Sequence, residues 1–150
     1  MIKKKSKKPT VTKLKKKLDT IFSKDIRLKD ADALGYVQCY TCGVKKLWEK
    51  DGMQAGHFMS RKHTITRWDE RNVKPQCYSC NCHFYGRQYE FGLHLDNEYG
   101  EGMSQELLIT SRQTQKNNVN DLEELIELYT DKLEQLLKNC LLYTSPSPRD

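Results

Sequence analysis

The 150-residue chain is poor in apolar residues and has no long run of them. Only 37% of its residues are apolar while 31% are charged, and the mean hydropathy of -0.83 is low even for a soluble protein. No segment approaches the roughly 20 consecutive apolar residues that cross a bilayer, and the lysine-rich start lacks the apolar stretch of a signal peptide. These absences argue against a membrane protein and predict an intracellular one.

A shortage of apolar residues also limits the core. The length suits one domain with extensions rather than two independent cores. Small domains with little apolar surface to bury are often stabilised by a bound metal ion. The six cysteines are the first candidates for its ligands.

Acidic residues are absent from the first 18 positions, so the positive charge is concentrated there. The net charge is +6, and without the nine lysines that precede Asp19 it would be about -3. These lysines are Lys3, Lys4, Lys5, Lys7, Lys8, Lys13, Lys15, Lys16 and Lys17. We expect residues 1–10 to form a disordered basic arm and Lys13, Lys15, Lys16 and Lys17 to contact DNA phosphates. The alternative is a solvated tail that only aids solubility.

Four of the cysteines form two CxxC pairs, Cys39 with Cys42 and Cys77 with Cys80. In an intracellular protein such pairs are more typical of metal ligands than of disulfides. Four thiolates around one ion are characteristic of a closed structural zinc site. The 34 residues between the pairs exceed the spacing of a simple zinc ribbon, and they contain His57.

The periodicity of apolar residues predicts a mixed α+β chain. A first helix is expected over residues 11–33, and Val37 with Gln38 should form a short strand into Cys39. Strands at 47–48 and 53–55 should form a hairpin around the turn at residues 50–52, which places His57 at the end of the second strand.

Helices dominate the second half of the predicted chain. One helix should follow Cys80 and break near Gly86. It should resume over residues 87–99 and stop at Gly100, with Tyr89, Leu93 and Leu95 packed inward. A shorter helix is expected over residues 104–112. The last should begin at a capping box of Asn120 and Glu123 and continue to about residue 138. Its apolar stripe is either core or a dimer seam. Residues 139–150 look non-native, with a Ser-Pro repeat that cannot continue a helix.

Residues around the second cysteine pair could perform phosphodiester chemistry. His57 can act as a general base, and the Asn72 amide could orient the loop that carries it. Asn81 and His83 could offer an oxygen and a nitrogen to Mg²⁺ or a similar ion. Basic side chains interleaved with Trp68 suggest a surface along a phosphate backbone, although a loop with one buried tryptophan fits as well. These side chains are Arg61, Lys62, Arg67 and Arg71.

The order CxxC, His, Asn, CxxCN resembles the zinc-knuckle branch of the His-Asn-His (HNH, ββα-metal) endonucleases. More narrowly, residues 54–58, 67–73 and 76–83 resemble the NinG (Rap) recombination endonucleases of lambda-like bacteriophages. The resemblance covers roughly residues 12–138. It implies an α+β fold with a small ββα-metal core at about residues 36–86, stapled by a four-cysteine zinc site and flanked by N- and C-terminal helices within a domain of residues 11–138.

The same resemblance implies a phage- or prophage-encoded endonuclease in the bacterial cytoplasm. Its expected substrates are branched recombination intermediates, Holliday junctions and D-loops. His57 would be the general base, Asn72 the residue that fixes the loop, and Asn81 with His83 ligands of the catalytic ion. A homodimer is possible, with the helix of residues 120–138 as its interface.

One departure from the nuclease pattern concerns the metal. Many HNH nucleases carry an acidic ligand immediately before the catalytic histidine, where this chain has Gly56, and Gln54 replaces a second acidic candidate. Asp51, Asp69 or Glu70 could supply a carboxylate instead, although Asp69 and Glu70 could equally pair with neighbouring arginines. The alternative function is a non-catalytic zinc-finger DNA-binding phage regulatory protein, which would need the cysteines and the lysines alone.

Overall fold

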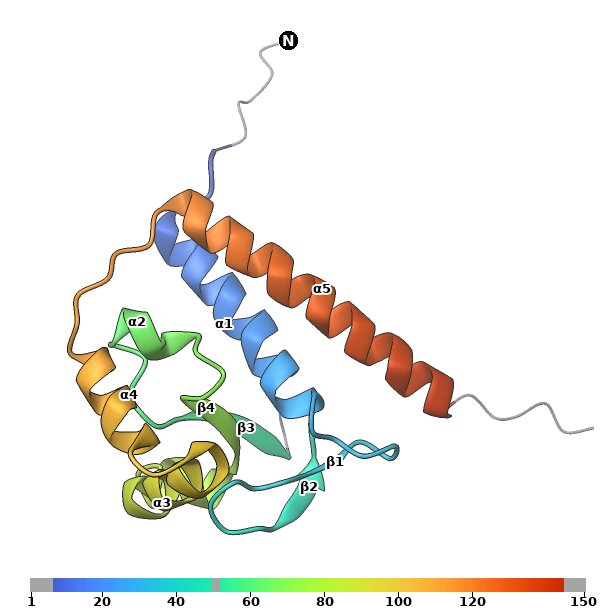
Figure 1. The fold of residues 1–150 in the computed structure, drawn as a ribbon. Helices are drawn as coiled ribbons and strands as arrows, with labels where there is room; N and C mark the ends of the chain where they lie inside the picture. The colour runs from blue at the N-terminus through green and yellow to red at the C-terminus, as the bar shows by residue number, and fades with distance from the viewer. Residues whose placement is uncertain (1–6, 50–51, 145–150) are drawn as a thin grey trace, which may run out of the picture.

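The structure is a computed structural model that describes residues 7–49 and 52–144, with side chains described up to residue 139. The order of elements confirms the expected mixture of helices and small sheets (Figure 1). The elements are α1 (Val11–Leu28), β1 (Tyr36–Gln38), β2 (Lys45–Leu47), β3 (Met53–His57), α2 (Thr64–Arg67), β4 (Val73–Cys77), the π-helical turn η1 (Ser79–His83), α3 (Gln88–Tyr99), α4 (Met103–Ser111) and α5 (Val119–Thr144).

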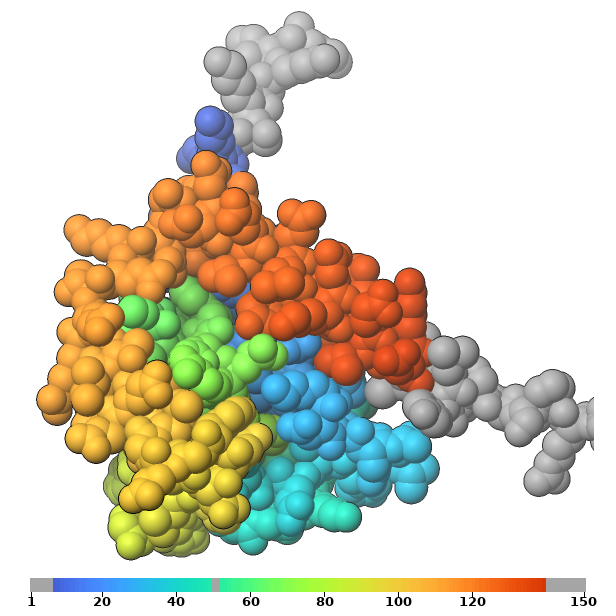
Figure 2. Space-filling view, viewed as in Figure 1, coloured from blue at the N-terminus to red at the C-terminus, as the bar shows by residue number. Residues whose placement is uncertain are grey.

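Helix α1 is central to the packing. Its first turn is capped by Thr10, whose Oγ1 accepts a hydrogen bond from the Lys13 N–H at 3.3 Å. Apolar side chains three or four positions apart form a buried stripe along α1, which comprises Leu14, Leu18, Phe22 and Ile26. Phe22 meets Tyr129 of α5 edge to face, with ring centroids 4.8 Å apart. The two helices therefore share one core, and α5 covers much of α1 in the view of Figure 2.

The ends of the two long helices differ from expectation. Helix α1 stops at Leu28 rather than Ala33, because the Asp32 carboxylate accepts hydrogen bonds from the Leu34 and Tyr36 N–H groups, both at 2.9 Å, and forms a turn. Helix α5 begins at Val119. Its capping box pairs Asn118 with Asp121, two positions before the expected pair.

The C-terminal part of α5 runs past the predicted end at residue 138 and continues to Thr144. Residues 145–150, which hold the Ser-Pro repeat, and residues 1–6 of the basic arm lie outside the described residues. Along α5 the predicted stripe contributes Leu122, Ile126 and Tyr129 to the core, whereas Leu137 is exposed. The first half of the stripe is therefore part of the core, which is one of the two interpretations of this helix offered by the sequence.

The predicted hairpin between residues 47–48 and 53–55 is wrong. Strand β2 pairs with β1, and β3 pairs with β4 in antiparallel register from Met53 opposite Cys77 to His57 opposite Val73. The first cysteine pair explains the difference. The chain reverses within residues 39–44, where the Cys39 N–H donates to the Val44 carbonyl at 2.8 Å, so β2 returns along β1. Strand β3 is then left to pair with β4, and His57 still ends β3 as predicted.

The β3–β4 hairpin lies between α1 on one side and α3 with α4 on the other (Figure 1). Trp68, in the loop between the strands, is buried against α1, which supports the alternative of a loop with one buried tryptophan. On α3 the predicted packing face is mostly wrong. Phe91 and Leu95 are buried, whereas Tyr89 and Leu93 lie on the opposite face and are exposed. In the described part of the chain, no helix is long and apolar enough to cross a membrane.

Candidate metal centre and adjoining cavity

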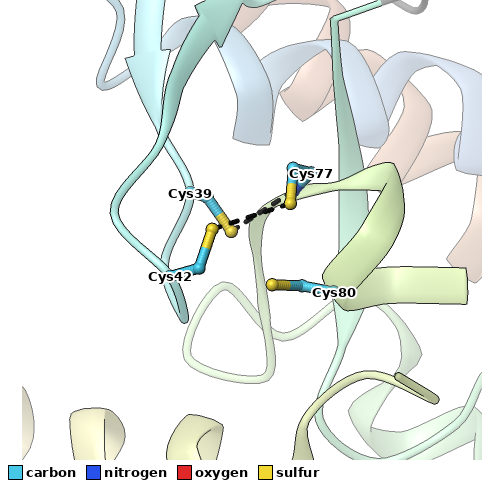
Figure 3. A group of neighbouring side chains, drawn as sticks. All are labelled: Cys39, Cys42, Cys77 and Cys80. Atoms are coloured by element: carbon cyan, nitrogen blue, oxygen red, sulfur yellow. Dashed lines mark hydrogen bonds between the residues drawn. The ribbon is translucent and has the colours of Figure 1, made fainter. Parts of the chain in front are cut away.

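The two cysteine pairs converge on one point. The four Sγ atoms of Cys39, Cys42, Cys77 and Cys80 all lie within 4.8 Å of one another, and those of Cys42 and Cys77 are 3.7 Å apart (Figure 3). Tetrahedral Zn–S bonds of about 2.3 Å separate the sulfurs by roughly 3.8 Å. The cluster therefore has the dimensions and the donor set of a structural zinc site.

Local backbone geometry aims these sulfurs. Cys39 follows β1, and Gly43 takes the left-handed conformation (φ 82°) that turns the chain directly after Cys42. Cys77 ends β4 and Cys80 lies one turn later in η1. The cluster thus joins the β1–β2 hairpin to the end of the β3–β4 hairpin.

Hydrogen bonds to sulfur prepare the cluster for a cation. Burial would raise the pKa of the Cys39 thiol, but N–H donors from Cys77 and Cys42 and the Thr41 hydroxyl overcome it and lower this pKa to about 6. Burial raises the pKa of Cys42 and of Cys77. The Cys39 thiolate therefore forms readily, whereas burial disfavours the thiolates of Cys42 and Cys77, which a cation at the centre would stabilise.

His57 is half-buried at the end of β3. Its Nε2 lies 3.0 Å from the Arg67 carbonyl oxygen. A carbonyl can only accept, so Nε2 carries the proton and the neutral ring has its lone pair on Nδ1. Burial lowers the pKa of His57 below its ordinary value of 6.5, and the neighbouring charge of Arg61 adds to this effect. The ring is therefore held neutral, oriented, and able to accept a proton at Nδ1.

Asn72 fixes the loop that follows His57. Its side chain is fully buried, and its Oδ1 accepts a hydrogen bond from the Met59 N–H at 2.8 Å. Its Nδ2 donates to the carbonyl oxygens of Met59 and Thr66, both at 3.0 Å. The amide thus holds the two backbone groups of Met59 and joins them to α2, the arrangement expected of a residue that orients the histidine loop.

A cavity of about 830 Å³ runs along β3 between α1 and the turn that follows η1. Its lining includes His57 and Asn81, so these two candidate residues face the same space. The Asn81 Nδ2 donates to the Gln54 Oε1 at 2.7 Å, which leaves the Asn81 Oδ1 as an available oxygen. Asp19 and Glu49 also line the cavity.

His83 is not brought into this group. Its ring is exposed and packs edge-on against Tyr78, with centroids 5.0 Å apart, and it does not line the cavity. Across the described residues, the four cysteines form the only cluster of three or more His, Cys, Asp or Glu groups close enough to hold an ion. A role for His83 as an ion ligand remains a prediction from the sequence.

The alternative carboxylates occupy other sites. Asp69 pairs with Arg71 at 2.9 Å, and Glu70 lies within 3.7 Å of Lys29 and 3.5 Å of Lys132. Asp51 lies outside the described residues. Gly56 has no room for an acid, because a Cβ atom there would lie 1.9 Å from the Gln76 Oε1.

The basic residues predicted to bind DNA fall into two groups. Six are exposed or half-buried and make no ion pair within the described residues: Lys13, Lys15, Lys16, Lys17, Arg61 and Lys62. The other two bind carboxylates of the protein. Arg67 donates from Nε and Nη2 to the two Asp19 oxygens at 3.0 and 2.5 Å, and Arg71 binds Asp69. Arg67 therefore joins α2 to α1, whereas the pair between Arg71 and Asp69, two residues apart, is local.

Sequence reasoning missed Asp19 and Tyr85, which both line the cavity with His57. Asp19 is the first acid after a run of lysines, and that isolation was a usable signal. It accepts hydrogen bonds from Arg67 and from the Trp68 Nε1 at 3.0 Å, and so anchors α1 to the segment whose carbonyl holds His57. Tyr85 carried no comparable signal.

The fold and the cluster define the class: an α+β protein with a four-cysteine site able to hold zinc. The family model of the bacteriophage lambda NinG protein matches residues 1–139. The chain therefore belongs to the NinG family, as the resemblance indicated. No curated protein and no solved structure matches it significantly.

Proposed function

We propose that this protein is a metal-dependent DNA endonuclease that cuts branched recombination intermediates such as Holliday junctions and D-loops. The observation that carries the proposal is the arrangement around His57. A neutral histidine is held by the Arg67 carbonyl and by a loop that Asn72 clamps, and it faces a large cavity. A zinc-finger protein that only binds DNA needs none of these features.

The chain's own residues suit the hydrolytic step. A water molecule in the cavity would give a proton to the His57 Nδ1 as its oxygen bonds to the phosphorus. The bond from the phosphorus to one bridging ester oxygen would then break, and that oxygen would leave and take up a proton from solvent. The Nε2 hydrogen bond to the Arg67 carbonyl keeps the ring in the required tautomer and stabilises the positive charge that it then gains. Asn72 acts indirectly, because it holds the loop and α2 in place around the histidine.

The zinc site would be structural in this scheme. Four sulfur ligands leave no position open for water or phosphate. A second divalent ion would stabilise the charge that develops on the scissile phosphate. Asn81 offers it one oxygen through Oδ1, and a hard ion such as Mg²⁺ takes most other ligands from water and phosphate.

A basic track could lead DNA to the cavity. Two residues of α1, Thr20 and Lys24, line the cavity. The same face of α1 carries three exposed lysines one or two helical turns before Thr20: Lys13, Lys16 and Lys17. The Thr20 hydroxyl donates to the Lys16 carbonyl at 3.1 Å, which reflects this stacking of turns. Arg61, in the segment after β3, also lines the cavity. Such a row would neutralise successive phosphates.

The test is cleavage of a labelled four-way junction beside a linear duplex of the same sequence, with zinc-loaded protein and Mg²⁺. We expect preferential cutting of the junction, and we expect His57→Ala to abolish cutting while DNA affinity stays nearly constant. His94→Ala, in an exposed histidine of α3, is the matched control and should cut normally. Binding without cleavage, with Mg²⁺ or Mn²⁺, would contradict the proposal and favour a zinc-finger regulatory protein.

A further inference from the structure

The turn between η1 and α3, residues 84–87, has an unusual backbone, and we call it the aromatic turn. Tyr85, Gly86 and Arg87 take φ values of 51°, 86° and 45° in succession. In the part of the chain that the structure describes, Tyr85 and Arg87 are the only non-glycine residues with positive φ. A left-handed backbone is strained for a tyrosine, so other contacts must hold it.

Those contacts come from Gln76 and from Cys80 of the metal centre. The Gly86 N–H donates to the Cys80 carbonyl at 2.8 Å, and the Gly86 carbonyl accepts from the Gln76 Nε2 at 2.9 Å. The Arg87 Nε donates to the Cys80 Sγ at 3.1 Å. Because Cys80 belongs to the cysteine cluster, zinc would make the strained turn a rigid part of the structure.

The held turn displays an aromatic ring at the cavity. Tyr85 is 88% exposed and lines the cavity together with His57 and Asn81. Its neighbour Phe84 is 53% exposed, and the Arg87 guanidinium carbon lies 4.0 Å from the Phe84 ring centroid. The fold gains little from Tyr85, because its ring is almost entirely in water. A strained position that keeps an apolar ring exposed beside a candidate catalytic base suggests a ligand for the ring.

The surroundings indicate the chemistry of that ligand. Three cationic side chains line the same cavity, those of Lys24, Arg27 and Arg61. They outnumber its two carboxylates, Asp19 and Glu49, and Asp19 is already paired with Arg67. The cavity therefore attracts phosphates. A ligand with phosphates and a flat face that stacks on tyrosine is a nucleotide whose base is not hidden in a helix. Bases inside a continuous duplex cannot reach the ring, whereas a branch point or a single strand offers unstacked ones.

We propose that Tyr85 is a stacking platform for an unpaired or unstacked base next to the scissile phosphate. It would thereby distinguish branched DNA from continuous duplex. The cleavage part of this inference rests on the proposed function, whereas base stacking can be measured without cleavage.

The first experiment measures binding with Ca²⁺ in place of Mg²⁺, using a four-way junction, a single strand and a linear duplex. Tyr85→Ala should weaken binding to the junction and the single strand by about 5- to 150-fold, the effect typical of one lost base–aromatic stack. Duplex binding should be unchanged, and Tyr85→Phe should bind like the wild type. Tyr89→Ala is the matched control, since Tyr89 is 76% exposed and does not line the cavity.

A second variant separates function from folding. Glycine adopts positive φ without strain, so Tyr85→Gly should melt at the same temperature as the wild type or higher, yet lose junction binding as Tyr85→Ala does. A fluorescent 2-aminopurine at the branch point should be quenched by the wild type and by Tyr89→Ala, and by neither Tyr85→Ala nor Tyr85→Gly.

The results overturn the inference if Tyr85→Ala binds the junction as tightly as the wild type, or if it weakens all three DNAs equally. Normal junction cleavage by Tyr85→Ala would also overturn it, while leaving the endonuclease intact. If the wild type cuts no DNA but shows Tyr85-dependent binding of unstacked bases, the proposed cleavage fails and the stacking site stands.

Discussion

The carboxamide of Gln76 occupies the space that a side chain at position 56 would need. A Cβ atom on Gly56 would lie 1.9 Å from the Gln76 Oε1 and 2.6 Å from its Cδ. The Gln76 Nε2 is bound to the Thr41 hydroxyl at 3.1 Å and to the Gly86 carbonyl. The glutamine therefore links the first cysteine pair to the aromatic turn by passing over Gly56.

This contact predicts that Gly56→Ala destabilises the protein. The added methyl group must displace a fully buried, hydrogen-bonded glutamine, and overpacking of this kind lowers the free energy of unfolding by about 1–3 kcal/mol. Urea unfolding of the zinc-loaded protein measures the loss. Gly92→Ala is the control, because a Cβ there meets its nearest neighbour at an ordinary 3.4 Å.

A double-mutant cycle can confirm the cause. Combined with Gln76→Ala, the Gly56→Ala substitution should be less damaging than it is alone, because the obstructing carboxamide is gone. Equal effects of Gly56→Ala in both backgrounds would show that Gln76 is not what restricts position 56.

The amide of Asn72 predicts different effects for two substitutions. Asn72→Ala removes three hydrogen bonds and leaves half-buried backbone groups of Met59 unpaired, which should lower the free energy of unfolding by about 1–3 kcal/mol. Asn72→Asp is isosteric, but it turns a carboxylate oxygen toward the carbonyl oxygens of Met59 and Thr66. We expect Asn72→Asp to lower the melting temperature more than Asn72→Ala does. Asn97→Ala, at an exposed site on α3, is the control in the same thermal melts. A milder effect of aspartate would argue against the observed orientation of the amide.

The cysteine cluster could be predicted from the sequence because ligand chemistry and CxxC spacing are local properties. The position of His57 at the end of a strand followed likewise from the local pattern. Strand pairing could not be predicted in this way. The turn signal at Gly52 is real, since its N–H donates to the Glu49 carbonyl at 2.8 Å, but the competing reversal at residues 39–44 takes β2 away.

The pairing of Arg67 within the protein could not be predicted for the same reason. Arg67 and Asp19 are 48 residues apart in the chain, and only the packing of α1 against the β3–β4 loop brings them together. Tyr85 depends on the fold even more strongly. Contacts of its neighbours hold its left-handed backbone: the Gly86 carbonyl accepts from the Gln76 Nε2, and the Arg87 Nε donates to the Cys80 Sγ. No local pattern at residues 84–87 reveals these contacts.

The buried histidine predicts a pH dependence of stability. Since the pKa of His57 is lower in the folded protein than its ordinary 6.5, the unfolded chain takes up a proton first as the pH falls. The contribution of His57 to the free energy of unfolding is therefore fully present above about pH 6.5. It is lost as the pH falls through 6.5 toward the pKa of His57 in the folded protein. Unfolding free energies of the wild type and His57→Gln should diverge in this range, with the wild type losing more. Parallel curves for the two proteins would contradict the prediction.

The sulfur geometry predicts that zinc holds the two hairpins together. Replacing Cys39, Cys77 or Cys80 with serine should eliminate stoichiometric zinc and lower the melting temperature, because each removes one of four ligands and the β1–β2 hairpin has little other core. Cys82→Ser is a close control. This cysteine is exposed two residues after Cys80, and its Sγ contacts the Gln54 Oε1 at 3.5 Å instead of the cluster. Elemental analysis of the purified variants should find one zinc per chain in the wild type and in Cys82→Ser. Retention of zinc in Cys80→Ser, or its loss in Cys82→Ser, would show that the ligand set differs from the four sulfurs that converge here.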